Sequence, residues 1–376
     1  MLQFQHKVVH ARYCAGFALL SVVFSLTLAG GGLAVRRGFS GGKLIFPKEM
    51  KILEKTLRKN QKPQKILGYN LSRVRESCEL YLLLLLPVVH LLFMNFMPMP
   101  GIAIAFQNYK IGQQEFLFGE NIRWVGLKHF ETFLTGRLFT RLVGNTLRIS
   151  IKSLICTFPI PIIFALALNE VKHMQTKKVV QTLSYMPHFI STVVVGGMVL
   201  SFLKTDGLIN VIIEAFGGKA TAIMNDPDNF DIVYILTIIW ISFGFDSILY
   251  MSAISGIDQE LYEAARLDGA SRWQQVWYIT LPGILPTVSI CLIMALGGIL
   301  GANTDLILNL YNTANRTKSD VIGTYVYRVG LGIEGASGSA QFSPTAAIGL
   351  FTSLINITML FIANKISNLL TDTGLW

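Results

Sequence analysis

Long apolar runs separated by short polar stretches dominate the chain from residue 79 onward. Each run is about 18 to 25 residues long, which suffices for a helix to cross a bilayer. Soluble domains carry about 25% charged residues, whereas this 376-residue chain has 14% charged and 52% hydrophobic residues. We therefore expect an all-α, multi-pass integral membrane protein. The pattern predicts six spans, at 79–98, 143–168, 182–203, 230–254, 283–303 and 345–366.

Residues 1–78 form an N-terminal extension ahead of a six-helix domain that covers 79–369. Residues 14–35 are uncharged and just long enough for one further membrane helix, but they are rich in Gly and Ser, so a signal-like segment stays open. Met50 then opens the basic stretch MKILEKTLRKNQKPQK. This stretch is typical of a cytoplasmic lead-in, and we expect a protein that begins at Met50 to assemble and function normally.

Charge asymmetry suggests which loops face the cytoplasm. If the basic lead-in lies inside, the loops at 169–181 and 255–282 also lie inside, whereas 99–142, 204–229 and 304–344 lie outside. Lys and Arg then number 18 inside against 10 outside, but only 6 against 10 without the lead-in. The orientation therefore depends on the lead-in and on the family resemblance given below.

The net charge of +10 does not indicate a nucleic-acid partner. No basic run is interleaved with stacking aromatic residues, and membrane proteins gain Lys and Arg on their cytoplasmic side. The four cysteines are scattered without a CxxC pair, so neither a disulfide framework nor a metal site is indicated. A phosphate-binding GxxxxGK[ST] loop is absent from the sequence. We expect no catalytic residue, metal or cofactor on this chain, and membrane lipid as its surroundings.

The stretch 255–282 is a polar island between two apolar runs. Asp258 is expected to cap a short helix by accepting its first free N–H groups, and Gly269 is expected to end that helix. Ser271 begins a second helix with a capping-box sequence. Pro282 is well placed at the start of the next helix, where its missing N–H has no partner anyway.

The polar island carries the pattern E-A-A, three residues, G, nine residues, I-x-L-P. It resembles the EAA loop of ABC-importer permeases at every position of that pattern. In that family the loop is a cytoplasmic coupling helix that docks in a cleft of the ATP-hydrolysing subunit, and the glycine is expected to permit a bend where a side chain would collide. The resemblance implies these ATPase-coupling residues: Glu263, Ala264, Ala265, Asp268, Gly269, Ile279, Leu281 and Pro282.

The chain also resembles carbohydrate-uptake permeases of the lipoprotein-dependent oligosaccharide and aldouronate type, over roughly 79–369. The similar stretches include FMPMPGIAIAFQNYK, WVGLKHF, VVQTLSYMPHFIS, SGIDQELYEAARLDGASRW and DVIGTYVYRVGL. One departure is Asp258-Gln259, where the family commonly has Asp-Pro. The resemblance implies a type I ABC importer permease of a bacterial cytoplasmic membrane. Its implied partners are a sister permease in a heterodimeric pore, two copies of an ATPase that binds ATP and Mg²⁺, and an extracytoplasmic sugar-binding protein.

Two alternatives stay open at this point. The EAA loop does not identify the cargo, so an importer for peptides, amino acids or ions is one alternative. An ion-coupled secondary transporter is the other, although it should show inverted repeats and ionisable residues at the midplane. No repeat is evident in the sequence. The cargo of the partner binding protein would separate the importers.

Some polar residues within the predicted spans are candidates for the substrate path. Asn145, Arg148 and Lys152 share one helical face, and Asp246 lies within the fourth span. Such residues usually face a partner helix or a wet cavity, so structural pairing and lining of the path both stay open. Two positive charges would suit an acidic sugar such as a uronide, whereas Asp246 would oppose one. Three aromatic residues of the fourth span are candidates for stacking on sugar rings: Trp240, Phe243 and Tyr250.

Two further patterns concern the shape of the spans. Gly297 and Gly301 have GxxxG spacing, which predicts close approach of a neighbouring helix. Prolines within a span free backbone groups and bend the helix. They occur at positions 87, 159, 161 and 187.

Overall fold

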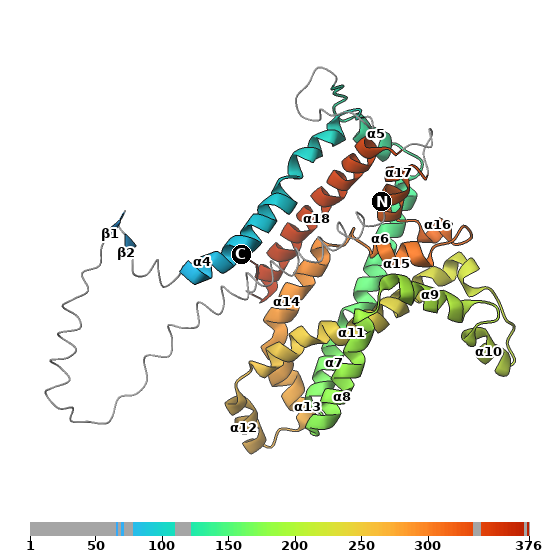
Figure 1. The fold of residues 1–376 in the computed structure, drawn as a ribbon. Coiled ribbons are helices and arrows are strands. Elements are labelled where there is room, and N and C mark those ends of the chain that lie inside the picture. Colours follow the sequence, from blue (N-terminus) through green and yellow to red (C-terminus); the bar gives the residue numbers. More distant parts are fainter. Residues whose placement is uncertain are drawn as a thin grey trace. The chain divides into compact units, whose positions relative to one another are not determined.

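The structure is a computed structural model that describes residues 65–66, 69–70, 78–109, 122–333, 340–371 and 374–375. The described chain is helical apart from a minimal hairpin of β1 (Lys65–Ile66) and β2 (Tyr69–Asn70), in which Ile66 pairs with Tyr69, and an isolated bridge between Gln107 and Trp124. Figure 1 shows the helices. The candidate segment 14–35 and most of the basic lead-in lie outside the described residues, so both remain predictions.

The chain divides into two compact units, the first ending at Gly101 and the second beginning at Ile102. The first unit contains α4 (Cys78–Leu91), which continues into the π-helical segment η2 (Leu92–Phe96). Every side chain from 81 to 100 is exposed in the isolated chain. A helix that is apolar all round is surrounded by lipid or by other membrane helices. The 3₁₀ segment η3 (Met99–Phe106) crosses the boundary between the units.

The second unit holds the remaining helices, whose bounds follow the chain. They are α5 (Lys128–Leu134), α6 (Phe139–Thr157), α7 (Pro159–Asn169), α8 (Met174–Tyr185), η4 (Met186–Phe189), α9 (Thr192–Leu203), α10 (Leu208–Ala215), η5 (Ile223–Asn225), η6 (Pro227–Asn229), α11 (Phe230–Ser255), α12 (Gln259–Leu267), α13 (Arg272–Gln275), η7 (Val276–Thr280), α14 (Leu281–Gly297), α15 (Thr304–Leu310), α16 (Arg316–Ser319), α17 (Ile322–Gly330) and α18 (Phe342–Thr371).

Among the described residues, six helical segments are long and apolar enough to cross a membrane. This confirms the predicted number of spans, although the third begins later than expected, at Thr192, and the fifth begins earlier, at Arg272. Residues 182–191 belong to α8, η4 and the extended residues after them, because a 3₁₀ turn begins at Met186 and Ile190 is extended. The six segments are Tyr81–Phe106, Phe139–Asn169, Thr192–Ala215, Pro227–Ser255, Arg272–Gly297 and Phe342–Leu369.

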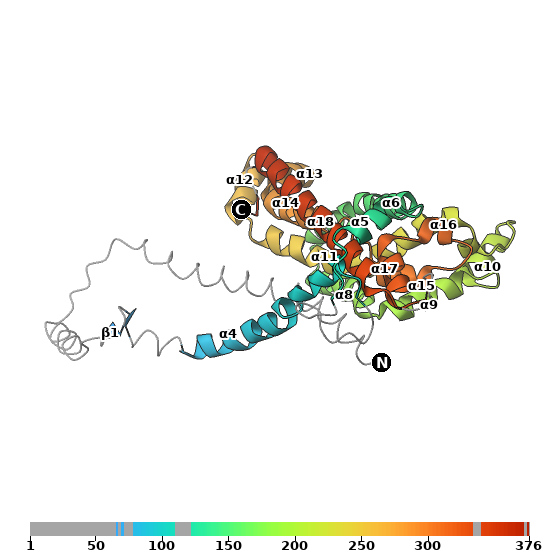
Figure 2. The ribbon, with the colours of Figure 1, turned by 90° about the horizontal axis from the view of Figure 1, so that it is seen from above.

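Helix α11 is the centre of the second unit. Its N-terminal half packs Phe230 against Leu306 and Leu310 of α15, in a cluster that also holds Ile149 of α6. Its C-terminal half packs with α7 and α14, and these residues form a second cluster: Ala165, Leu168, Tyr250, Met251, Ile254 and Ile284. Helices α14 and α18 lie side by side in both views (Figures 1 and 2). Because α11 is held along its length and leads directly into α12, movement of α12 would reach the bundle.

Two glycines permit close helix approaches. A Cβ on Gly244 of α11 would collide with the backbone carbonyl of Ser184 in α8. A Cβ on Gly297 would lie 2.8 Å from Leu360 of α18, which confirms close approach at this position. Gly301 lies beyond the end of α14 and has only Gly298 nearby. The predicted GxxxG pair is therefore wrong, because α14 ends before its second glycine.

Candidate functional site: the coupling element and the charged stripe

Residues 258–282, here called the coupling element, fold as the short helix α12, a turn, α13, η7 and the first residues of α14. The Asp258 carboxylate accepts a hydrogen bond of 3.0 Å from the backbone N–H of Glu260, so the predicted cap is confirmed. The predicted capping box at the start of α13 is also present, with Ser271 and Gln274 bonded reciprocally. The local sequence therefore determines where both short helices begin.

Gly269 ends α12 in the left-handed conformation, with φ of 81°. The N–H of Ala270 donates to the carbonyl of Ala265 at 2.9 Å, and the N–H of Gly269 donates to that of Arg266 at 3.1 Å. These two bonds form a Schellman motif, for which glycine is the usual residue. No atom would lie within 4 Å of a Cβ on Gly269. The expected collision is therefore wrong, and the positive φ is what requires glycine.

The inner face of α12 is attached to the start of the next span. Tyr262 is 8% exposed, and its hydroxyl lies 2.9 Å from Oγ1 of Thr280 in η7. Gln275 donates from Nε2 to the carbonyl of Ala270 at 3.0 Å, which holds the turn against α13. Leu281 packs into the cluster around α11, and Pro282 lies in the first turn of α14. The motif residues after Gly269 therefore return the chain to the bundle.

The outer face of α12 is free in the isolated chain. Leu261 is 54% exposed and Leu267 is 90% exposed, and Ala264 lies between them on the same side. Exposed acids surround these apolar side chains. We call this surface the docking ridge, and it consists of Glu260, Leu261, Glu263, Ala264, Leu267 and Asp268. An apolar ridge with an acidic rim fits a partner cleft with an apolar floor and basic edges.

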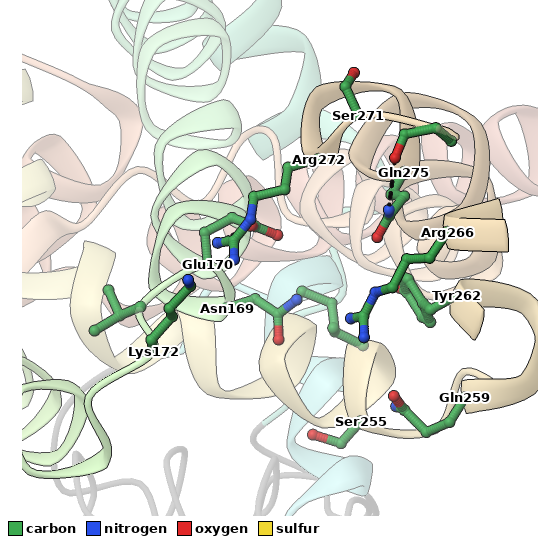
Figure 3. Close-up of a pocket in the computed structure, with 13 residues that line it drawn as sticks. Asn169, Glu170, Lys172, Ser255, Gln259, Tyr262, Arg266, Ser271, Arg272 and Gln275 are labelled. Carbon is green, nitrogen blue, oxygen red and sulfur yellow. Dashed lines mark hydrogen bonds and ion pairs between the residues drawn. The ribbon is translucent and has the colours of Figure 1, made fainter. Parts of the chain in front are cut away.

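An open cavity of about 810 Å³ lies behind the docking ridge, between α12 and residues 169–172 at the end of α7 (Figure 3). Gln259, Tyr262 and Arg266 line it from the inner face of α12. Arg272 approaches Glu170 to 3.5 Å and joins the two sides of the cavity. Local sequence patterns do not indicate this cavity, because its two sides are about 90 residues apart in the chain.

Asn145, Arg148 and Lys152 lie on one face of α6, as predicted, and form the charged stripe. Asn145 is 6% exposed and donates from Nδ2 to the carbonyls of Thr317 and Asp320 at 3.0 and 2.9 Å. These bonds attach α6 to α16 and to the residue directly after it. The amide of Asn145 is thus occupied by main-chain partners.

Asp231, in the first turn of α11, pairs with both cations of the charged stripe. Its Oδ2 lies 3.1 Å from Nε of Arg148 and 2.8 Å from Nζ of Lys152. Arg148 also donates to the carbonyl of Lys318 at 2.7 Å. The Lys152 side chain remains 53% exposed. Because one carboxylate balances two cations, the group keeps one surplus positive charge beside an accessible lysine.

Sequence reasoning missed two acids that organise this region, Asp231 and Asp320. Asp320 is fully buried and pairs with Arg328 at 2.7 Å and with Arg141 at 3.5 Å. Arg141 precedes the charged stripe by one turn on the same face of α6. Cations on a membrane helix indicate that acids from another element pair with them. The sequence does not identify those acids.

The structure separates the remaining path candidates on α11. Trp240 is 41% exposed and Asp246 is also exposed in the isolated chain, although their spacing of six residues places them about 120° apart around the helix. Phe243 packs edge to face on Phe164 of α7 at 5.1 Å, and Tyr250 is buried in the core at 4% exposure. Asp246 lies 15 residues beyond Asp231, about 22 Å along the helix, so it is not part of the charged stripe.

Comparison with known proteins gives three consistent similarities. Residues 157–371 match the family model described as "Binding-protein-dependent transport system inner membrane component". The chain is 39% identical to the polygalacturonan/rhamnogalacturonan transport system permease protein YteP of Bacillus subtilis (strain 168), over 79% of this chain and 90% of the relative. It is 36% identical to protein LplB of the same organism, over 79% and 91% of the two chains.

Two solved structures of ABC transporters are also similar to this chain. One is a bacterial ABC transporter involved in the import of the acidic polysaccharide alginate, with a TM-score of 0.69 and 36% identity over 80% of this chain and 98% of that chain. The other is a bacterial alginate ABC transporter in complex with an alginate pentasaccharide-bound periplasmic protein, with a TM-score of 0.70 and 36% identity over 81% and 99%.

Proposed function

The chain belongs to the family of binding-protein-dependent transport system inner membrane components, and we propose that it forms one half of a pore through which acidic oligosaccharides enter the cytoplasm. It is an all-helical, multi-pass membrane protein and a permease of a sugar or polysaccharide ABC importer.

The docking ridge supports coupling to a partner ATPase. It presents exposed leucines within an acidic rim, whereas the opposite face of the same helix is attached to η7 through Tyr262 and Thr280. A partner that pushes on the ridge would therefore move the start of α14. The partner is an ATPase present in two copies, which binds ATP and Mg²⁺ and docks at the ridge. Glu263 and Asp268 pair with its basic residues, and Ala264 and Ala265 permit close packing.

The other partners follow from the same arrangement. A sister permease completes the pore, and an extracytoplasmic binding protein delivers the sugar. The solved alginate transporter in complex with its pentasaccharide-bound periplasmic protein supports this assembly. The complex resides in the bacterial cytoplasmic membrane, with the coupling element inside.

Two observations support an acidic cargo. One relative is named for polygalacturonan/rhamnogalacturonan and one solved structure for alginate, polymers that contain uronate carboxylates. In this chain, Asp231 leaves one surplus positive charge beside the half-exposed Lys152. A uronate carboxylate is the complementary charge for that site. Two exposed side chains of α11 would add contacts: Trp240 would stack on a sugar ring, and Asp246 would accept hydrogen bonds from sugar hydroxyls.

The test is uptake by the assembled complex in proteoliposomes, with ATP enclosed and the binding protein outside. Two labelled cargoes of equal length are compared, a uronate trisaccharide and a neutral trisaccharide. We expect ATP-dependent accumulation of the uronate at least tenfold above that of the neutral sugar. Accumulation driven by an ion gradient without ATP would instead establish a secondary transporter. Preference for the neutral sugar, a peptide or an amino acid would overturn the cargo class.

A further inference from the structure

The cavity behind α12 is lined by residues at the ends of three candidate spans. Asn169 ends the span that begins in α6, Ser255 ends the span of α11, and Arg272 begins the span that leads into α14. These three helices are 26 to 31 residues long, more than the about 20 that cross the hydrocarbon, so their ends and the cavity lie at the membrane surface, within reach of lipid head groups. We propose that this cavity binds the phosphate-bearing head group of an anionic membrane lipid.

The cavity carries a surplus of positive charge. Three basic side chains line it, Lys172, Arg266 and Arg272, against the single acid Glu170. Arg272 and Glu170 approach each other to 3.5 Å. Within the described part of the chain, no carboxylate pairs with Lys172 or Arg266. In Figure 3 the Arg266 side chain extends from α12 into the hollow, toward Asn169. Two cations thus remain available to an anion.

The lining chemistry fits a phosphate that belongs to a lipid. A guanidinium can bind two phosphate oxygens at once, and a lysine adds a further charge. Neutral polar side chains of Asn169, Ser255 and Gln259 line the same hollow. Val171 and Ile254 add an apolar part, which suits the glycerol and the first carbons of acyl chains. Basic pockets between spans on the cytoplasmic side are typical sites for anionic head groups.

The position of the site implies what the lipid does. Gln259, Tyr262 and Arg266 recur at i, i+3 and i+7, so they share one face of α12, and Ala264 and Leu267 lie on the opposite face. A lipid can therefore occupy the inner face while the ATPase occupies the docking ridge. The bound head group would fill the hollow and keep α12 from tilting inward. Coupling between ATP hydrolysis and transport would then depend on anionic lipid.

The test uses the full complex in nanodiscs of phosphatidylcholine, with or without phosphatidylglycerol. Native mass spectrometry counts the phosphatidylglycerol molecules that remain bound to the complex. The cavity variant is the double substitution Lys172→Gln/Arg266→Gln. The matched control is Lys177→Gln/Lys178→Gln, which removes two charges from α8 outside the cavity lining. Gel filtration of every variant establishes that the complex has assembled, and Lys172→Gln alone serves if the double variant does not assemble.

We expect the cavity variant to retain at least fivefold less phosphatidylglycerol at this site than the wild type, and the control to retain it fully. Phosphatidylglycerol should also raise substrate-stimulated ATPase activity at least threefold in the wild type and not in the cavity variant. Equal retention in both variants, or equal loss, would overturn the proposal. A third condition adds inorganic phosphate to phosphatidylcholine nanodiscs that contain no phosphatidylglycerol. An equal rise in activity with phosphate would reject the lipid in favour of the free anion.

Discussion

The hydroxyl of Tyr262 in α12 lies 2.9 Å from Oγ1 of Thr280 in η7, and both side chains are buried. This bond connects the inner face of the coupling element to the residue directly before α14. Both residues belong to the 25-residue coupling element, and the outer face of its helix α12 is exposed. A force applied at the docking ridge would therefore be transmitted to the membrane span through this hydrogen bond.

Removing this hydroxyl should weaken the attachment of α12. Tyr262→Phe eliminates one buried hydrogen bond, worth about 1 kcal/mol, and Oγ1 of Thr280 keeps only its longer contact of 3.4 Å to the carbonyl of Gln275. We expect the apparent melting temperature of the purified complex to fall by about 2 to 4 °C and the ratio of transport to ATP hydrolysis to fall. Tyr278→Phe is the matched control, because Tyr278 is 79% exposed. Equal effects of both substitutions would contradict this role of Tyr262.

The conformation of Gly269 predicts a graded series of substitutions. Its φ of 81° costs an ordinary residue about 1 to 2 kcal/mol, and more for a β-branched side chain, whereas asparagine tolerates it. We expect Gly269→Asn to keep most of the substrate-stimulated ATPase activity and Gly269→Val to lose most of it. The space around Gly269 is open, so side-chain volume is not the cause. Loss of activity that followed volume instead of φ tolerance would disprove this explanation.

Asp231 is the residue on which the charged stripe depends. Asp231→Asn leaves Arg148 and Lys152 without their carboxylate, and we expect a cost of about 2 to 3 kcal/mol, below the range for fully buried pairs because Lys152 is half exposed. Lys152→Gln alone should cost about 1 kcal/mol or less. Thermal unfolding of both single variants and the double variant measures the coupling between the two sites. Additive effects would show that the pair at 2.8 Å contributes nothing.

Lys152 also separates the two roles left open for the charged stripe. If its ammonium attracts the cargo, Lys152→Gln should reduce uptake of a uronate trisaccharide at least fivefold while uptake of a neutral one is unchanged. A structural role alone predicts that both cargoes are affected equally. Asp246→Asn, about 22 Å away along α11, is the comparison, since loss of an acceptor for sugar hydroxyls should affect the charged and the neutral cargo alike.

Gly244 predicts a packing defect that no neighbouring side chain can relieve. A methyl group at this position would collide with the backbone carbonyl of Ser184, so Gly244→Ala must separate α11 from α8. We expect a loss of about 3 kcal/mol or failure to assemble. Gly197→Ala on α9 is the matched control, because nothing lies within 4 Å of a Cβ there. Gel filtration and melting of the two complexes provide the measurement, and equal stability would contradict the packing found at Gly244.

Local signals in the sequence predicted much of the coupling element. The cap at Asp258, the capping box at Ser271 and the stop at Gly269 each depend on hydrogen bonds within a few residues, so their spacing is sufficient. The six spans were also predictable, because length and hydrophobicity decide them. The third span was misplaced by its N-terminal limit, since hydropathy does not register the 3₁₀ turn that begins at Met186.

Contacts between distant elements could not be predicted in the same way. Spacing placed Arg148 and Lys152 on one face of α6, but nothing local pointed to Asp231, which is 79 residues from Lys152. Tyr250 and Trp240 are both aromatic residues of α11, yet only Tyr250 is buried. The reason is that α7 and α14 pack around the C-terminal half of α11. The cavity behind α12 likewise depends on the loop after α7 meeting the coupling element.

The most direct test of coupling through the docking ridge is Glu263→Lys, measured in the assembled complex in proteoliposomes. Glu263 is exposed on α12 and makes no ion pair with the described residues, so the reversal should leave folding and assembly intact. Sugar uptake and substrate-stimulated ATP hydrolysis are measured together, with Glu214→Lys on α10 as the control for charge. We predict that both activities fall at least tenfold in Glu263→Lys, about 1.4 kcal/mol or more of lost coupling, and stay unchanged in the control. Normal uptake by an assembled Glu263→Lys complex would contradict the account.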